Sequence, residues 1–201
     1  MHILHLSDTH GHHRALKDLP TADLIVHSGD IGFAGTDSEF IDFINWFIKL
    51  NYQYKILVGG NHDSYIEEED AEQIQKILPK NCYYLCHSGV TIEGLKFWGV
   101  PLFVSENISG VYFDMLEKIP SNTDILVTHQ PPYGILDKAE PYNFGCRELL
   151  DIVLAIRPKY HLFGHIHDAY GMEKKEHTTF VNASIVDENY ELKNRFFEFE
   201  I

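Results

Sequence analysis

Short polar turns of this chain carry side chains that bind metal ions and transfer protons. The residues concerned are Asp8, His10, Asp30, Asn61, His62, Asp63, His129, His165 and His167. Carboxylates, a carboxamide oxygen and neutral imidazoles together make a mixed oxygen and nitrogen ligand set, which suits manganese, iron or zinc better than calcium. These residue types therefore predict a site for transition-metal ions.

The spacing within the turns favours a shared pocket. In Asp8-x-His10 and His165-x-His167 the paired side chains flank one residue, so both can face the same way in an extended turn. Glycines that permit sharp turns and close backbone approach precede the polar groups, at Gly29, Gly59, Gly60 and Gly164. Each motif alone is better explained as a polar cap on a strand. Together, each closing an apolar run, they indicate one constellation.

Apolar runs precede these turns and are predicted to be the strands that hold them. The runs are Ile3 to Leu6, Leu24 to Val26, Tyr54 to Val58, Ile125 to Val127 and Tyr160 to Phe163. Their length and composition are typical of buried strands. Open α/β sheets place ligands at the carboxyl ends of their strands, so we expect the polar turns to meet at one edge.

Helical patterns alternate with the predicted strands. Thr36-Asp37-Ser38-Glu39 has the Thr-x-x-Glu form of a capping box, and Phe40 to Ile48 carries apolar residues at helical spacing. Asp70 to Leu78 and Cys146 to Ile156 are two further predicted helices, each followed by a proline. The alternation of strands and helices predicts an α/β fold.

Two further regions are predicted to contain strands. Cys82 to Trp98 is expected to form short strands with a tight turn at Glu93-Gly94, and Thr178 to Ile201 is expected to form more. The α/β fold therefore includes some antiparallel strands. With 201 residues, of which 44% are hydrophobic, the chain suits a single domain over residues 1–201.

The charge balance limits the possible partners. The chain has 30 acidic and 16 basic residues, a formal net charge of −14. A surface this acidic repels a polyanion, so we do not expect a long nucleic acid as a partner. Bound divalent cations would offset the charge locally, so a small phosphate-ester substrate remains compatible.

Cysteine usage and hydropathy indicate a soluble cytoplasmic protein. The odd count of three cysteines (Cys82, Cys86 and Cys146) fits free thiols in a reducing compartment better than a disulfide framework. Cys82 and Cys86 lack the second pair of ligands that a zinc site needs, so we interpret them as small buried hydrophobes. The sequence contains neither a leader pattern nor an apolar run of membrane-spanning length.

The metal-ligand motifs follow one another in a fixed order: Asp8-x-His10, Gly29-Asp30, Gly60-Asn61-His62-Asp63, Thr128-His129 and Gly164-His165-Ile166-His167. Together they resemble the five blocks of the calcineurin-like metallophosphoesterase superfamily. The chain is also similar to the small metallophosphoesterase-domain-containing branch, which is class III cyclic nucleotide phosphodiesterase-like. Val181-Asn182-Ala183-Ser184 resembles that branch in particular. The resemblance implies two mixed β-sheets packed as a sandwich and flanked by helices.

The resemblance also implies a dinuclear metal centre. Two groups would each hold one divalent ion: Asp8, His10 and His167 for the first, and Asn61, His129 and His165 for the second. Asp30 would bridge both ions, His62 would be the general acid, and Asp63 would orient His62. Two cations about 3.5–4 Å apart need a shared anion, and they acidify a water molecule to give a metal-bridging hydroxide. The leaving alkoxide needs a proton, which imidazole supplies near neutral pH.

The favoured function is a dinuclear metal-dependent phosphodiesterase acting on small phosphodiesters such as cyclic nucleotides. Without a large insertion to form a specificity domain, we expect a shallow site. A phosphomonoesterase, including a protein phosphatase, is the alternative, because the metal motifs are common to both. A non-catalytic scaffold fits less well, since the ligand set is complete. Manganese is the ion that we most expect to support activity in vitro, with iron and zinc as alternatives.

Several nearby residues are expected to lie outside the core site. We interpret His12 and His13 as solvated loop histidines, Arg147 as a surface residue, and Glu67 to Asp70 as an acidic cap at a helix start. Gln130 stands where a smaller residue is expected in some relatives, so it could alter the mouth of the pocket. The oligomeric state and the natural substrate stay open.

Overall fold

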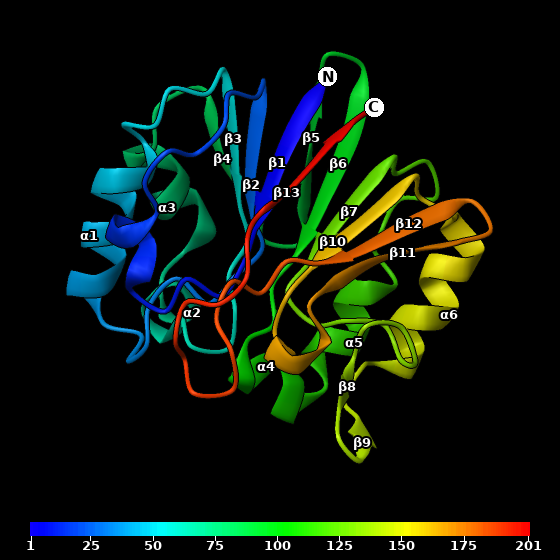
Figure 1. Ribbon diagram of the computed structural model, residues 1–201. Helices are drawn as coiled ribbons and strands as arrows, with labels where there is room; N and C mark the ends of the chain where they lie inside the picture. Colours follow the sequence, from blue (N-terminus) through cyan, green and yellow to red (C-terminus); the bar gives the residue numbers. More distant parts are fainter.

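Two β-sheets form the centre of the computed structural model, which describes every residue from Met1 to Ile201 (Figure 1). The first sheet has five strands in the order β13-β1-β2-β3-β4. Its strands are β1 (His2–Leu6), β2 (Leu24–His27), β3 (Tyr54–Leu57), β4 (Cys82–Tyr84) and β13 (Phe197–Glu200). Strands β1 to β4 run parallel, and β13 joins the edge antiparallel to β1.

The second sheet has six strands in the order β11-β12-β10-β7-β6-β5. Its strands are β5 (Ser88–Ile92), β6 (Leu95–Val100), β7 (Ile125–Thr128), β10 (Tyr160–Phe163), β11 (Gly171–Lys175) and β12 (Thr178–Asn182). Strands β6, β7, β10 and β12 are parallel, and β5 and β11 complete antiparallel pairs at the two edges. Both sheets are therefore mixed, as the resemblance implied.

Helices cover the outer faces of both sheets (Figure 1). The first sheet is covered by α1 (Asp37–Phe47), α2 (Ser64–Glu68) and α3 (Ala71–Ile77), and the second by α5 (Val111–Leu116) and α6 (Arg147–Ile156). The short helix α4 (Val104–Ser109) precedes α5 and has no buried residue. Short elements complete the chain: η1 (His12–Ala15), η2 (His167–Ala169) and the hairpin of β8 (Lys138–Ala139) and β9 (Tyr142–Asn143). None of the helices has the length and apolar character needed to cross a bilayer.

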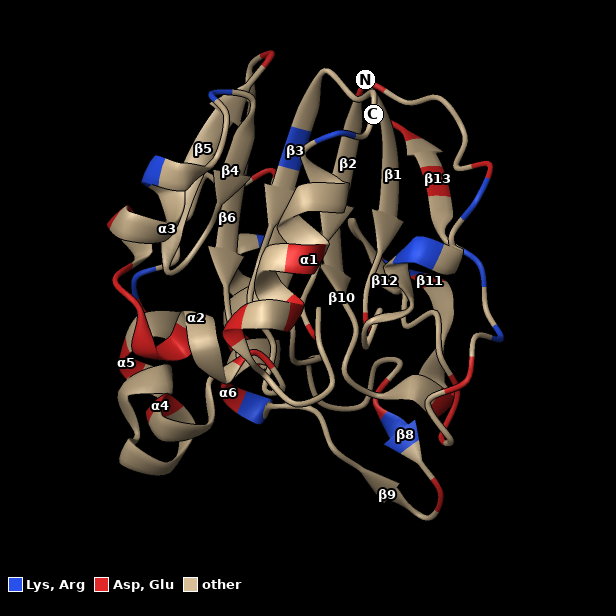
Figure 2. Ribbon diagram, turned by 90° about the vertical axis from the view of Figure 1, so that its left-hand side faces the viewer, with Lys and Arg blue, Asp and Glu red and all other residues tan.

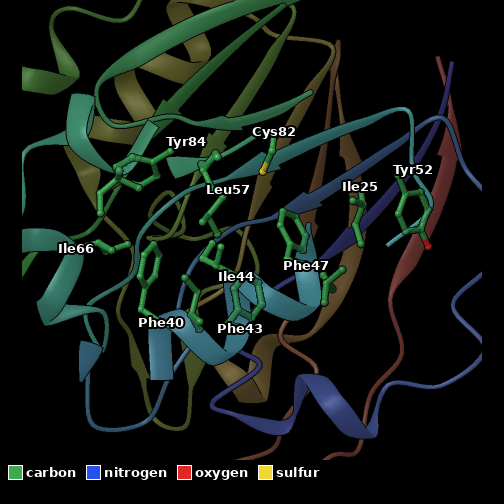
Figure 3. Close-up of a cluster of buried hydrophobic side chains, with 14 of the residues drawn as sticks. Ile25, Phe40, Phe43, Ile44, Phe47, Tyr52, Leu57, Ile66, Cys82 and Tyr84 are labelled. Carbon is green, nitrogen blue, oxygen red and sulfur yellow. The ribbon is translucent and has the colours of Figure 1, made fainter. Parts of the chain in front are cut away.

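Alternating strand residues build two apolar layers around the first sheet. Val26 and Ile56 point inward and pack with the second sheet in the layer between the sheets. Their neighbours Ile25 and Leu57 point the other way, toward α1 (Figure 3). This alternation follows from the pleat of a strand, which sends successive side chains to opposite faces. The predicted sandwich of two sheets flanked by helices is confirmed.

Helix α1 begins and packs as its sequence predicts. The Thr36 side chain accepts a hydrogen bond from the Glu39 backbone N–H at 3.3 Å, and the Glu39 carboxylate accepts one from the Thr36 N–H at 3.0 Å. This is the predicted capping box. Phe40, Phe43 and Phe47 are buried against the first sheet (Figure 3).

Other elements differ from the sequence-based prediction. Helices α2, α4 and α5 are too short to give a helical pattern of their own, and they were not predicted. Glu67 and Glu68 belong to α2 instead of starting a helix, whereas the Asp70 side chain caps α3 by accepting the Glu72 N–H at 2.7 Å. Within Thr178 to Ile201, where strands were predicted, β12 and β13 form and a long loop separates them.

Candidate metal centre

Two groups of metal-binding side chains lie at the carboxyl ends of the strands. The first group comprises Asp8, His10 and His167, and the second Asp30, His129 and His165. Within each group the ligand atoms all lie within 4.8 Å of one another. Residues from β1, β2, β7 and β10 and the turns after them thus meet, although they are far apart in the sequence.

Asp30 joins the two groups into one centre. Its Oδ2 atom lies 3.5 Å from His10 Nε2 in the first group and 3.3 Å from His129 Nε2 in the second. Asn61 is part of the same arrangement, because its Oδ1 atom lies 3.2 Å from His129 Nε2. All the ligand residues singled out from the sequence are therefore brought together.

The backbone holds the two carboxylates in place. The His62 N–H donates to Asp30 Oδ1 at 2.9 Å, and the His165 N–H donates to Asp8 Oδ1 at 3.1 Å. A β-carbon at Gly60 would collide with the Asp30 carboxylate, and one at Gly164 with that of Asp8. Glycine is required at both positions because the turn passes directly against the carboxylate of the neighbouring strand.

Ser184 is a further contact of the Asp8 carboxylate. Its hydroxyl donates to Asp8 Oδ2 at 2.7 Å, and both residues are completely buried. Ser184 lies in the Val181-Asn182-Ala183-Ser184 motif that contributed to the resemblance, but the sequence assigned it no role. Its contact with Asp8 spans 176 residues, so only the tertiary structure shows it.

Backbone carbonyls orient three of the imidazoles. Each Nδ1 lies at hydrogen-bonding distance from a carbonyl oxygen: His10 from Gly32 at 3.2 Å, His129 from Ser28 at 2.8 Å and His167 from Asp187 at 2.9 Å. An Nδ1–H that donates to a carbonyl leaves the Nε2 lone pair free for a metal ion. The Nε2 atom of His10 is buried with no hydrogen-bond partner, so it lacks the partner that a cation would supply. The residues present therefore fit metal ions.

The electrostatics of the centre also fit cations. Burial opposes ionisation of Asp8, but His167 and His129 hold its pKa well below the usual range. For Asp30, His129 likewise outweighs burial and lowers the pKa to about 2. Burial alone would lower the pKa of His129, yet the Asp30 and Asp8 carboxylates raise it to about 9. Two carboxylates that stay ionised thus face these imidazoles, and their negative charge favours a bound cation in place of an imidazole proton.

His62 lies beside the centre with one ring nitrogen engaged. Its Nδ1 atom is 2.9 Å from the Phe33 carbonyl oxygen, and its ring centroid is 4.9 Å from that of His10. The expectation that Asp63 orients His62 is not met. The Asp63 carboxylate is buried under the loop, where it accepts N–H groups of Ile31 at 2.9 Å and Gly60 at 2.8 Å. The Phe33 carbonyl makes the orienting contact instead.

An open cleft of about 340 Å³ gives access to the centre. Predicted site residues line its floor: Asp30, Asn61, His62, His165 and His167. Its walls include residues that the sequence did not single out: Ala139, Phe144, Asp168, Glu188 and Tyr190. No lysine or arginine lines the cleft. Ala139 ends the two-residue strand β8, Asp168 lies in the short η2, and the other wall residues lie in loops, so no periodic pattern identified them.

The two histidines after the first motif do not line the cleft. His12 Nε2 lies 2.9 Å from the Tyr190 carbonyl oxygen. His13 is buried, and its Nε2 lies 3.1 Å from Asp42 Oδ2. The interpretation of His13 as a solvated residue is therefore wrong, because the ring packs against Phe43 of α1.

Arg147 and Gln130 also lie outside the cleft lining. Arg147 begins α6 on the surface, where its guanidinium stacks 3.6 Å from the centre of the Tyr133 ring. Gln130 Nε2 lies 3.4 Å from the Phe144 carbonyl oxygen, so it contacts the segment that forms one cleft wall. Neither side chain is placed to contact a substrate phosphate at the centre.

Comparisons with known proteins agree with this arrangement. The model of the calcineurin-like phosphoesterase family matches residues 1–169. Metallophosphoesterase domain-containing protein 1 of Homo sapiens and that of Mus musculus are each 35% identical over 223 residues, covering 94% of this chain and 67% of the relative. The uncharacterized metallophosphoesterase YkoQ of Bacillus subtilis is 28% identical over 149 residues, covering 65% of this chain and 53% of that protein.

A solved structure shares the fold. The crystal structure of TT1561 of Thermus thermophilus aligns with a TM-score of 0.66 at 16% identity, covering 96% of each chain. At that identity the likeness concerns the fold alone. The family model and the relatives at 35% identity match most of this chain in sequence, so they show its family as well as its fold. On these grounds the chain belongs to the calcineurin-like metallophosphoesterases, phosphoester hydrolases that use divalent metal ions.

Proposed function

We propose that this protein is a dinuclear metal-dependent phosphodiesterase that hydrolyses small phosphodiesters. The observation that carries the proposal is the position of Asp30 between the two groups of predicted ligands. Asp30 lies 3.5 Å from His10 Nε2 on one side and 3.3 Å from His129 Nε2 on the other. A carboxylate in that position is suited to be shared by two cations.

Each group of ligands would hold one divalent ion, with Asp30 shared between them. The first ion would be held by Asp8, His10 and His167, and the second by Asn61, His129 and His165. When bound, such ions neutralise phosphate oxygens and acidify a water molecule, which supplies the nucleophile. Manganese is the ion to test first, followed by iron and zinc, because mixed imidazole and carboxylate sites accept all three.

His62 would supply the proton that the leaving oxygen needs. With Nδ1–H donating to the Phe33 carbonyl, the proton to be transferred resides on Nε2. His62 also lines the cleft, so a substrate in the cleft can reach its ring. Protonation of a leaving alkoxide by a positioned imidazole is general acid catalysis.

The charge of the cleft walls favours diesters over monoesters. A monoester carries one more negative charge at neutral pH than a diester. Asp168 and Glu188 line the walls, and no lysine or arginine accompanies them. The additional charge of a monoester therefore meets carboxylates without a compensating cation from the protein. Cyclic nucleotides are singly charged diesters and are our first choice of natural substrate.

The test compares bis(4-nitrophenyl) phosphate with 4-nitrophenyl phosphate, using protein stripped of metal and reloaded with manganese. We expect metal-dependent turnover with a higher kcat/KM for the diester. A higher kcat/KM for the monoester would instead establish a phosphomonoesterase. No turnover of either ester, with both ions bound by elemental analysis, would indicate a non-catalytic scaffold.

A paired variant tests the charge argument directly. Replacing both wall carboxylates, by Asp168→Asn and Glu188→Gln, should narrow the preference for the diester. Glu191→Gln is the matched control, since Glu191 is on the same loop as Glu188 but does not line the cleft. An unchanged preference in the double variant would show that the walls do not select the substrate charge.

A further inference from the structure

We propose that the loop of residues 187–192, called here the wall loop, is a substrate-positioning element, and that its Tyr190 ring packs against a flat apolar ester group of the substrate. This inference rests on the proposed phosphodiesterase function and specifies its substrate class. The preferred substrate is a singly charged phosphodiester with a flat ring in the ester group that stays on phosphorus, as the base of a cyclic nucleotide does.

The Tyr190 ring lies beside the candidate metal centre, and Tyr190 lines the open cleft. Its centroid is 4.8 Å from that of His10 and 5.2 Å from that of His167, two ligands of the first group. Phe33 packs against it at 5.0 Å. These three rings are edge-to-face with Tyr190, as is the His62 ring at 6.1 Å, and Tyr190 also lines the cleft.

The backbone of Tyr190 is held in an unfavourable conformation. Its φ is 62°, in the left-handed region that is unfavourable for a residue with a β-carbon. Glycine would adopt this φ without that cost. A bulky aromatic residue at such a position beside a candidate active site points to a use for its side chain.

Hydrogen bonds within the wall loop maintain that conformation. The Tyr190 N–H donates to the Asp187 carbonyl at 2.9 Å. Asp187 Oδ1 accepts the N–H groups of Asn189 at 2.9 Å and Glu191 at 3.2 Å. The Asp187 N–H in turn donates to the Glu191 carbonyl at 2.9 Å. The loop is thus a defined turn that presents one ring to the cleft.

The wall loop is also tied to the turns that carry the metal ligands. His12 Nε2 lies 2.9 Å from the Tyr190 carbonyl oxygen, and His167 Nδ1 lies 2.9 Å from the Asp187 carbonyl oxygen. One contact joins the loop to the residues after β1, and the other joins it to a predicted ligand. The His12 contact gives that residue a role, since it holds Tyr190 at a fixed distance from the centre.

The chemistry of the remaining walls selects the ester group. Phe144 and Ile166 line the same cleft as Tyr190, so an apolar group can contact apolar and aromatic side chains there. Aromatic rings prefer offset or edge-to-face contact with another ring, which adds to the gain from burying apolar area. A methyl ester would leave most of this surface in contact with water.

The experiment uses two diesters with the same leaving group, phenyl 4-nitrophenyl phosphate and methyl 4-nitrophenyl phosphate, and the manganese-loaded protein. The measured quantity is the ratio of their kcat/KM values in each variant. Tyr190→Gly removes the ring and accepts the φ of 62° without strain. We expect it to lower the ratio about fivefold, mainly through the KM of the phenyl ester. Tyr190→Phe keeps the ring and should show the same ratio as the parent protein.

Two further variants separate positioning from a general structural effect. His12→Ala removes the contact with the Tyr190 carbonyl and should lower the same ratio, whereas His12→Gln retains an N–H donor and should restore it. Tyr142→Gly is the control, because Tyr142 is 67% exposed and does not line the cleft. It should leave the ratio unchanged.

Binding of unreactive diesters provides a readout that does not depend on turnover. By calorimetry, Tyr190→Gly should weaken diphenyl phosphate about fivefold and leave dimethyl phosphate unchanged. Equal ratios and equal dissociation constants for Tyr190→Gly and the parent protein would overturn the inference, while diester turnover by the parent would still support the proposed function. Tyr190-dependent binding of diphenyl phosphate without any diester turnover would support the wall loop and refute the phosphodiesterase.

Discussion

At the scale of single residues, Asp30 is the carboxylate that lies between the two groups of candidate ligands. It is 2% exposed and lies within 3.5 Å of an imidazole nitrogen of each group. Asp30→Ala is therefore expected to lower the content of both metal ions, measured by elemental analysis after reloading. Asp124→Ala, which removes a carboxylate paired with Lys159 away from the centre, should retain both ions. Full occupancy in Asp30→Ala would contradict a shared ligand.

His62 gives a prediction that depends on the leaving group. If its Nε2 protonates the leaving oxygen, His62→Ala should slow esters of weakly acidic alcohols about 10²–10⁴-fold. Esters of 4-nitrophenol, which leaves without a proton, should be slowed much less. The measurement is kcat for a series of diesters with leaving groups of increasing pKa. An equal loss across the series, with metal content intact, would remove the general acid role.

The contacts of single residues also show which parts of the candidate site could be predicted from the sequence. Every ligand predicted from residue type and spacing is found at the centre, because metal chemistry requires particular side chains. Asp63 was predicted to orient His62, whereas in the structure the His62 ring contacts the Phe33 carbonyl. A backbone carbonyl is present in every residue, so no residue type marks it.

At the scale of elements, the start of α1 supports the candidate centre. Beyond its bond with Thr36, the Glu39 carboxylate accepts the N–H of Phe33 at 2.9 Å and that of Ala34 at 3.1 Å. It therefore fixes the loop between Asp30 and α1. The same loop provides the carbonyl that orients His62. The capping box that the sequence predicted thus has a second consequence, which is the position of the proposed acid.

Glu39→Ala tests this connection. We expect the free energy of unfolding to fall by about 1–2 kcal/mol, the range for loss of a helix cap, together with a lower kcat. Urea unfolding and steady-state rates are the measurements. Glu72→Ala replaces an exposed glutamate in the first turn of α3 and should change neither quantity appreciably. Loss of stability without any loss of kcat would confine Glu39 to the helix.

At the scale of the whole molecule, a layer of buried histidines lies behind the metal centre. His5, His27 and His161 are completely buried, and each ring bonds a hydroxyl group, of Ser28, Thr9 and Thr128 respectively. Burial lowers the pKa of each of the three to about 3, from an ordinary value of 6.5. The folded protein therefore keeps these rings neutral where the unfolded chain would protonate them.

This layer predicts how stability depends on pH. Between about pH 3 and pH 6.5 the unfolded chain binds more protons at these histidines, so the free energy of unfolding should rise with pH. Each net proton contributes about 1.4 kcal/mol per pH unit. Asp63 has the opposite effect on the free energy of unfolding, since burial and Asp30 raise its pKa to about 7. It is a single group, so the three histidines outweigh it.

Urea unfolding of the metal-free protein over this pH range is the measurement. His161→Gln should reduce the slope by the contribution of one proton, because burial alone accounts for its lowered pKa. His2→Gln is the control, at a partly exposed histidine of β1. A free energy of unfolding that is flat or falls with pH across the range would contradict the prediction.

The distribution of charge is a second property of the whole molecule. Acidic residues mark α1 and α2, which carry no lysine or arginine (Figure 2). The cleft continues this pattern with Asp168 and Glu188 in its walls. Small singly charged esters are therefore the expected partners, and a long nucleic acid is not.

The sequence by itself determined the strands, the turns after them and the ligand set. Apolar runs and turn residues are local signals, and the candidate ligands are specific side chains, so β1, β2, β3, β7 and β10 and the residues at their ends could be predicted from the printed order of residues. Helices α2, α4 and α5 could not be predicted, because five or six residues are too few to show a period.

Only the tertiary structure decided which surfaces surround those ligands. Tyr190 reaches His10 across 180 positions of the chain, and the carbonyl of Asp187 bonds the ring of His167. Such contacts depend on how the two sheets pack and where the long loop after β12 returns. They involve backbone groups and nonperiodic loops, whose positions follow from the packing of the whole chain and leave no local pattern in the sequence.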